Sequence, residues 1–219
     1  MDGDALRRAM TLYAITDRLW LAGRSLESVV DQALRAGVTC LQLREKNADP
    51  IEEARLARSL RDVCLRYGVP FIVNDHLDIA LSCDADGVHV GQSDCSCSQA
   101  RSLLGAEKIV GVSVQTVDQA LRAQREGADY LGVGALYRTS TKPEAADVGL
   151  QEVRAICDAV DIPVVGIGGL NGDTVGTLRH SGLDGVAVVS AVFAADDITR
   201  ATIDLRRRVV AALELEDGE

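Results

Sequence analysis

Residues 162–169 read IPVVGIGG, a short apolar run that ends in glycines. Runs of the same kind, rich in Val, Ile and Leu, occur at residues 11–16, 39–43, 70–73, 87–90, 108–113, 129–133 and 185–189. Near-continuous apolar runs of this length are typical of parallel strands that are buried on both faces. The chain is therefore predicted to contain eight parallel strands.

Between these runs, apolar residues recur three and four positions apart, which predicts helices. Several of the helical stretches end at a glycine, as helices with left-handed C-caps do; examples are Gly37, Gly68, Gly127 and Gly182. Eight strand–helix units in 219 residues favour an α/β fold, a single-domain (β/α)8 TIM barrel at the compact end of its size range. The alternative is an open, doubly wound sheet, which usually has fewer strands in this length.

The barrel is expected to span residues 11–213, between an N-terminal extension (1–10) and an acidic tail (214–219). We expect the tail and the first few residues to lack regular structure. No linker or second-domain signal is present in the sequence.

The chain carries a formal net charge of −10, from 33 acidic and 23 basic residues. This balance argues against nucleic acid and against an anionic membrane surface as partners. No apolar stretch has the length of a membrane span. The six cysteines lack the spacing of a disulfide framework, so we expect reduced thiols and a cytoplasmic location.

Active sites of such barrels lie at the carboxyl ends of the strands. After the second run, the segment Gln42-Leu43-Arg44-Glu45-Lys46 alternates polar and apolar residues, which places Gln42, Arg44 and Lys46 on one face. If that face is the barrel mouth, its two cations need an anionic ligand to offset their desolvation. The alternative is a charged strand end in solvent.

Two carboxylates follow the third and fourth runs. Asp75 comes directly after Asn74, and Asp94 follows residues 87–93. Neighbouring barrel strands would bring them together, and Mg²⁺ is bound by one or two carboxylates with water and phosphate oxygens. The alternative is that both residues are helix N-caps.

Two further loops have the composition of anion sites. The segment 134–148 is long and contains Thr139, Ser140, Thr141 and Lys142, whose hydroxyl, backbone N–H and ammonium groups suit an oxyanion. The glycines at 166–169 and the end of the eighth run, Val189-Ser190, occupy the positions where barrels often bind phosphate. Ser113 ends the fifth run. The histidines His76, His89 and His180 lack metal-ligand spacing and are interpreted as structural.

Taken in chain order, these segments resemble the thiamine-phosphate synthases, and the resemblance extends from about residue 11 to about residue 195. Its most specific parts are the Gln-Leu-Arg-Glu-Lys block at 42–46 and the Thr-x-Thr-Lys loop at 139–142. The resemblance implies a TIM-barrel transferase of thiamine biosynthesis. Such an enzyme joins hydroxymethylpyrimidine diphosphate to hydroxyethylthiazole phosphate and releases pyrophosphate.

The resemblance also implies roles for individual residues. The pyrimidine diphosphate would be held by Gln42, Arg44, Lys46, Asn74, Ser113 and Lys142. The thiazole phosphate would be held by Thr139, Ser140, Thr141, Gly169, Val189 and Ser190. One Mg²⁺ ion would be held by Asp75 and Asp94, and a homodimer is compatible with the resemblance. Departures from the family pattern are Cys95-Ser96-Cys97 after the second metal-binding Asp, and Asp147 before Val-Gly-Leu.

Two other functions are compatible with a barrel of this kind. A thiazole tautomerase-like enzyme would need neither the carboxylate pair nor the cations for a diphosphate. A noncatalytic sensor of thiazole phosphate would use only the loops after the last two strands. Because the acidic pair and all three cations are present, the sequence favours the synthase.

Overall fold

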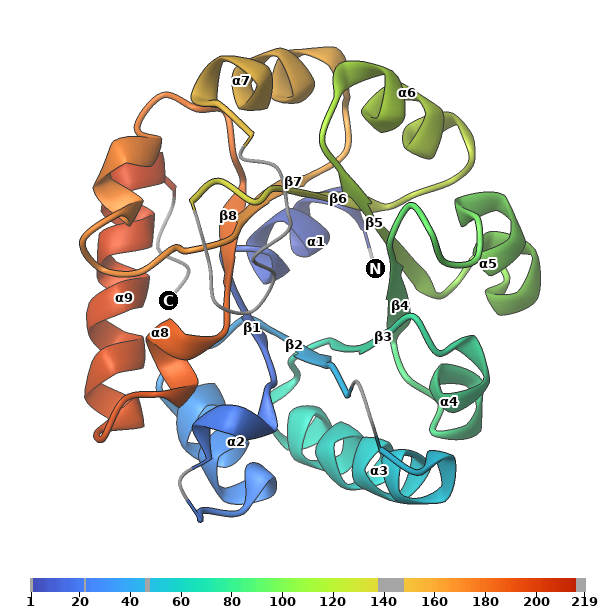
Figure 1. Ribbon diagram of the computed structural model, residues 1–219, viewed down its shortest axis with the longest axis vertical. Helices are drawn as coiled ribbons and strands as arrows, with labels where there is room; N and C mark the ends of the chain where they lie inside the picture. The colour runs from blue at the N-terminus through green and yellow to red at the C-terminus, as the bar shows by residue number, and fades with distance from the viewer. Residues whose placement is uncertain (1, 22, 46–47, 138–147, 216–219) are drawn as a thin grey trace.

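The computed structural model describes residues 2–21, 23–45, 48–137 and 148–215. Within them, eight parallel strands form a closed barrel in the order β1 to β8, and β8 pairs with β1 (Figure 1). The strands are β1 (Leu12–Ile15), β2 (Cys40–Leu43), β3 (Phe71–Asn74), β4 (Gly87–Val90), β5 (Ile109–Val114), β6 (Tyr130–Val133), β7 (Val164–Ile167) and β8 (Gly185–Val188). The predicted barrel is confirmed, and the open doubly wound sheet is excluded.

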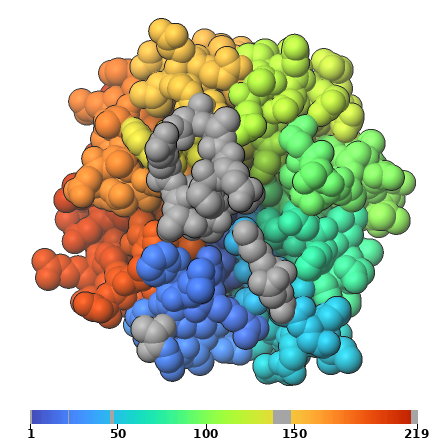
Figure 2. All heavy atoms as spheres, viewed as in Figure 1, coloured from blue at the N-terminus to red at the C-terminus, as the bar shows by residue number. Residues whose placement is uncertain are grey.

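Helices surround the strands (Figure 1), and the space-filling view shows the successive units following one another around a round perimeter (Figure 2). The α-helices outside the barrel are α2 (Leu26–Arg35), α3 (Pro50–Tyr67), α4 (Leu77–Ser82), α5 (Cys97–Leu104), α6 (Val117–Arg125), α7 (Leu150–Ala159), α8 (Ser190–Phe193) and α9 (Ile198–Leu213). A 3-10 turn, η1 (Arg18–Trp20), follows β1. Gly68 ends α3 in the predicted left-handed conformation, with φ 64°.

Strand alternation divides the core into two layers. Leu41 and Leu43 are fully buried and belong to the cluster between the strands and the outer helices. Tyr13, Ile72 and Tyr130 belong to a second cluster that fills the barrel. The two faces of each strand thus meet different surroundings, as the pleat of a strand requires.

The first few residues were predicted to lack regular structure, and this prediction is wrong. They form α1 (Gly3–Ala9), whose N-cap is Asp2; the Asp2 side chain accepts a hydrogen bond from the amide of Ala5 at 2.7 Å. Leu6 and Met10 pack with the interior cluster of the barrel, and Figure 1 shows α1 inside the ring of strands. Because β1 begins directly after it, α1 lies at the amino-terminal end of the barrel.

The seventh unit also differs from the expectation of an α-helix after every strand. The segment after β7 forms only a short 3-10 helix, η2 (Val175–Leu178). Its sequence, Val-Gly-Thr-Leu, contains glycine and two β-branched residues, which have lower helix propensity.

Among the described residues, no helix combines the length and the apolar character that a bilayer crossing needs.

Candidate functional site

A cavity of about 370 Å³ lies at the carboxyl ends of the strands. Residues from all eight strands line it, and the loops after β4, β7 and β8 complete its wall. The barrel therefore presents its mouth as a pocket, at the end where barrel enzymes carry their chemistry.

The structure brings most of the described candidate residues to this cavity. Those that line it are Gln42, Arg44, Asn74, Asp94, Ser113, Gly169, Val189 and Ser190. Asp75, next to Asn74, lines an adjoining cleft instead. The candidates Lys46, Thr139, Ser140, Thr141 and Lys142 lie outside the described residues, as does Asp147.

The alternation predicted for the segment after the second run is confirmed in its described part. Gln42 is only 2% exposed, and its amide nitrogen donates to the hydroxyl of Tyr13 inside the barrel at 2.7 Å. Arg44 follows on the same face, is half-buried and lines the cavity. Across the described residues, no carboxylate is paired with the Arg44 guanidinium, whereas the neighbouring Glu45 is paired with Arg18 at 2.8 Å.

The alternative interpretation of Asp75 and Asp94 as helix caps is excluded. The N-cap of α4 is His76, and the N-cap of α5 is Ser96, which forms a complete capping box with Gln99. The Asp94 Oδ2 atom instead accepts the Gly91 amide at 2.8 Å, across its own loop. Neither carboxylate therefore caps a helix.

Asp75 is placed beside the fourth strand by its backbone. Its φ is 60°, a left-handed conformation that Asp tolerates better than most residues, and its amide donates to the carbonyl of His89 at 2.8 Å. The carboxylates therefore follow neighbouring strands, β3 and β4, as the sequence predicted. Asp94 lies on the cavity side and Asp75 at its edge.

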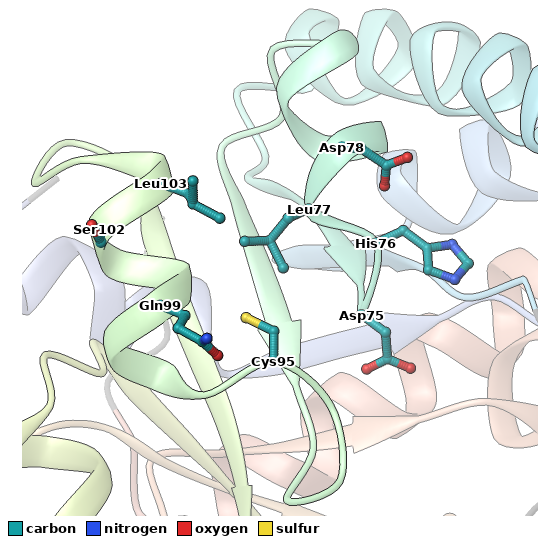
Figure 3. A pocket seen from close by; sticks show the side chains of 8 residues that line it. All are labelled: Asp75, His76, Leu77, Asp78, Cys95, Gln99, Ser102 and Leu103. Carbon is teal, nitrogen blue, oxygen red and sulfur yellow. The ribbon is translucent and has the colours of Figure 1, made fainter.

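The adjoining cleft, about 580 Å³ in volume, lies between α4 and α5. Figure 3 shows Leu77, Leu103 and Cys95 pointing toward one another across it, while the Asp75 carboxylate and the His76 ring point away. The His76 Nδ1 atom contacts Glu53 Oε1 at 2.8 Å, and the Glu53 side chain is 3% exposed.

Cys97, the first residue of α5, is buried. The Cys95-Ser96-Cys97 segment therefore begins a helix.

The loop after β7 comes very close to the segment after β6. Gly168 has φ 100°, and a Cβ atom there would lie 2.7 Å from the Cα of Ala135. Only glycine meets both conditions without strain. This contact brings the neighbouring Gly169 to the cavity wall, after the strand that pairs with β8.

Three of the cavity residues that the sequence did not identify have aromatic rings. Tyr13, His89 and Tyr130 all line the pocket. The signal for His89 was strand alternation, since it lies between Val88 and Val90, which pack outward. Tyr13 and Tyr130 gave no such signal, because buried aromatic residues are common in any core.

Comparison with known proteins adds independent evidence. The family model described as thiamine monophosphate synthase matches residues 12–192. The chain belongs to this family. The thiamine-phosphate synthase of Clostridioides difficile (strain 630) is 46% identical over 200 residues, covering 91% of this chain and 95% of its own length. That of Chloroflexus aurantiacus is 48% identical over 204 residues, covering 93% and 94%.

Solved structures agree with this membership of the thiamine monophosphate synthase family. The thiamine phosphate pyrophosphorylase of Pyrococcus furiosus superposes with a TM-score of 0.87 at 39% identity, over 95% of this chain and 99% of that one. The 3-hexulose-6-phosphate synthase structure, at 18% identity and a TM-score of 0.65, shares the fold. Membership in the synthase family makes this chain an enzyme, a transferase of thiamine biosynthesis.

Proposed function

We propose that this chain condenses hydroxymethylpyrimidine diphosphate with hydroxyethylthiazole phosphate, giving thiamine phosphate and pyrophosphate. The observation that carries the proposal is Arg44: a half-buried cation at the wall of the barrel mouth, with no carboxylate partner among the described residues. A cation removed from water in this way requires a compensating anion. A diphosphate substrate supplies one.

The proposed binding groups divide between the two substrates. The pyrimidine diphosphate is held by Gln42, Arg44, Asn74 and Ser113, with Lys46 and Lys142 as further cations. The thiazole phosphate is held by Gly169, Val189 and Ser190, with the hydroxyls of Thr139, Ser140 and Thr141. In support, the described members of both sets line one cavity, so the two rings can be held within reacting distance.

A single Mg²⁺ ion forms part of the proposal. The described residues contain no group of three or more His, Cys, Asp or Glu side chains that could enclose a metal. Mg²⁺ does not need one, since it commonly takes one or two carboxylates and completes its shell with water and substrate phosphate. Asp75 and Asp94, which cap no helix, fit this donor set. A bound Mg²⁺ ion would supply positive charge close to the diphosphate.

The proposed reaction is a dissociative substitution. The bond between the pyrimidine methylene carbon and the diphosphate oxygen breaks, and pyrophosphate leaves with the electron pair. The amino group of the pyrimidine shares the positive charge, and the thiazole nitrogen then forms the new bond with its lone pair. Arg44, Lys46 and Lys142 stabilise the negative charge that builds up on the leaving group. No proton is removed from the nucleophile, so no general base is needed.

The direct test incubates the pure protein with both substrates and Mg²⁺ and measures thiamine phosphate and pyrophosphate. We expect the two products in equal amounts, and no product when a chelator removes the metal. Isomerisation of a thiazole carboxylate phosphate without condensation would favour the tautomerase-like alternative. Binding of thiazole phosphate with neither reaction would favour the sensor.

The substitution Asp75→Asn tests the metal assignment. We expect the rate of condensation to fall at least about hundredfold, because the charge on the leaving group is less well compensated. Binding of thiazole phosphate, measured by calorimetry, should change by less than about twofold. Asp78→Asn removes a carboxylate from the same cleft and serves as the matched control (Figure 3). Equal loss of both properties in Asp75→Asn would contradict the assignment.

The proposal includes a cytoplasmic location, for which the six free cysteines are the supporting observation. Four of them are buried, namely Cys40, Cys64, Cys83 and Cys97. Burial raises the pKa of each of these thiols, to about 11 for Cys97. Protonated, buried thiols are inert, so they fit a structural role.

A further inference from the structure

Five polar side chains form one continuous chain of hydrogen bonds across the inside of the barrel. The Gln42 amide nitrogen donates to the Tyr13 hydroxyl at 2.7 Å, and that hydroxyl lies 2.8 Å from the hydroxyl of Tyr130. The Tyr130 hydroxyl lies 2.9 Å from Nδ1 of His89, and Nε2 of His89 lies 2.9 Å from Oγ of Ser113. The five residues come from five different strands, and all line the cavity.

Both phenols in this chain stay neutral. Tyr130 is 0% exposed and Tyr13 is 1% exposed. Burial away from water raises the pKa of both hydroxyls well above its usual value, because a buried phenolate would lose its hydration. Each hydroxyl therefore keeps its one hydrogen, which it can donate to only one neighbour.

The amide of Gln42 sets the direction of the chain. An amide nitrogen only donates, so the Tyr13 oxygen accepts from it, and the Tyr13 hydrogen goes to the Tyr130 oxygen. In the reverse order, the Tyr13 hydrogen would turn toward the sulfur of Cys40, and sulfur is a weak acceptor.

The same direction continues to the end of the chain. The hydrogen of Tyr130 goes to Nδ1 of His89, so in its neutral form the imidazole carries its proton on Nε2 and donates to Oγ of Ser113. The Ser113 oxygen accepts this bond, so its own hydrogen is turned toward another acceptor.

Packing holds these rings in place. The Tyr13 and Tyr130 rings meet edge to face, with centroids 5.8 Å apart, and the His89 and Tyr130 centroids are 5.5 Å apart. Space for them comes from two glycines on neighbouring strands. A Cβ atom at Gly111 would lie 2.1 Å from Cζ of Tyr130, and one at Gly132 would lie 3.2 Å from Cε1 of His89.

We propose that Tyr13 and Tyr130 are positioning residues, which hold His89 in its Nε2–H tautomer and so turn the Ser113 hydroxyl hydrogen into the cavity. There it donates to an acceptor atom of the bound ligand. The part of this inference that concerns the ligand rests on the proposed function, in which Ser113 contacts the pyrimidine diphosphate. The part that concerns the tautomer is a property of the protein alone.

The tautomer is measured directly by ¹⁵N NMR of histidine-labelled protein, at a pH where the imidazoles are neutral. The His89 signals are identified by their loss in His89→Gln. In the unsubstituted protein we expect Nε2 to carry the proton and Nδ1 to be the unprotonated nitrogen. The opposite tautomer, or an even mixture of the two, would overturn the proposal without any variant.

The variant Tyr130→Phe removes the donor to Nδ1 and keeps the ring. We expect the His89 signals to shift toward a mixture of tautomers. We also expect kcat/KM for the pyrimidine diphosphate to fall about tenfold, with the KM of thiazole phosphate unchanged. Tyr67→Phe, which removes an equivalent hydroxyl from α3 outside the barrel, is the control and should change neither property. Unchanged His89 signals in Tyr130→Phe would refute the positioning role.

The two readouts separate this inference from the proposed function. If the protein makes no thiamine phosphate but shows the expected tautomer and its response to Tyr130→Phe, the proposed function fails and the positioning role stands. If the enzyme is active and Tyr130→Phe retains full kcat/KM, the effect on Ser113 is refuted.

Discussion

The substitution Gly111→Ala tests how strictly the barrel interior is built around the ring of Tyr130. Gly111 lies in β5 beside Tyr130 of β6, with which it is paired in the sheet. The added Cβ atom would lie 2.1 Å from Cζ and 2.4 Å from the hydroxyl oxygen. Ordinary contact begins at 3.4 Å, so the ring or the strand has to move by about 1.3 Å.

The expected cost follows from that displacement. Overpacking in a dense core costs about 1–3 kcal/mol. The displaced hydroxyl also loses good geometry with Tyr13 and His89, which costs about 1 kcal/mol for each hydrogen bond. Replacing glycine by alanine restricts the unfolded chain and offsets about 0.7 kcal/mol. We therefore expect the free energy of unfolding to fall by about 3 kcal/mol.

Urea denaturation followed by circular dichroism measures this change, and a double-mutant cycle identifies its cause. In a Tyr130→Leu background the phenol ring is absent, so Gly111→Ala should cost less than about 1 kcal/mol. The coupling between the two positions should then be about 2 kcal/mol. An equal cost in both backgrounds would show that the ring is not what requires glycine at this position.

Two further predictions concern the rim and the outer helices. Gly168→Ala should raise the KM for thiazole phosphate about tenfold and lower the free energy of unfolding by about 1–3 kcal/mol, because Gly168 has φ 100° and its added Cβ atom would clash with Ala135. Gly176→Ala is the control, since a Cβ atom there has nothing within 4 Å. Equal effects of the two substitutions would contradict this prediction. The hydrogen bond from Tyr67 lowers the pKa of Asp31 below its ordinary 3.8, so this contribution to stability is present above pH 3.8 and is lost as the pH falls through the folded-state value. Tyr67→Phe should therefore cost about 0.5 kcal/mol in urea titrations at pH 7 and less at pH 3, and a difference independent of pH would refute this cause.

The barrel was predictable from the sequence because its signal is local and repeated. Each strand is a short apolar run between amphipathic stretches, and Gln42 and Arg44 could be assigned to one face by alternation alone. The helix α1 was missed because it is short and offers the core few apolar residues, among them Leu6. Its position depends on the closed shape of the barrel, which no local sequence pattern predicts.

The site was predictable to a lesser extent. The sequence could not distinguish capping from metal binding for Asp75 and Asp94. The structure excludes capping, because His76 and Ser96 occupy the cap positions, and metal binding stays a prediction. The sequence also could not predict the chain of hydrogen bonds inside the barrel. Tyr13 and Tyr130 are 117 positions apart and meet only because the strands close into a ring. The side chains that matter there have the composition of an ordinary core.

The position of α1 also bears on the order of events during turnover. Leu6, Ala9 and Met10 fill the amino-terminal end of the barrel, so within the described residues the cavity faces solvent at the opposite end. In the proposed reaction, two reactants and two products would then share one passage. A ligand bound near the surface blocks the exchange of a ligand bound deeper, and the deeper one is the first to arrive and the last to leave. With the amino-terminal end filled, two proposed substrates held at different depths of this cavity would bind in a fixed order.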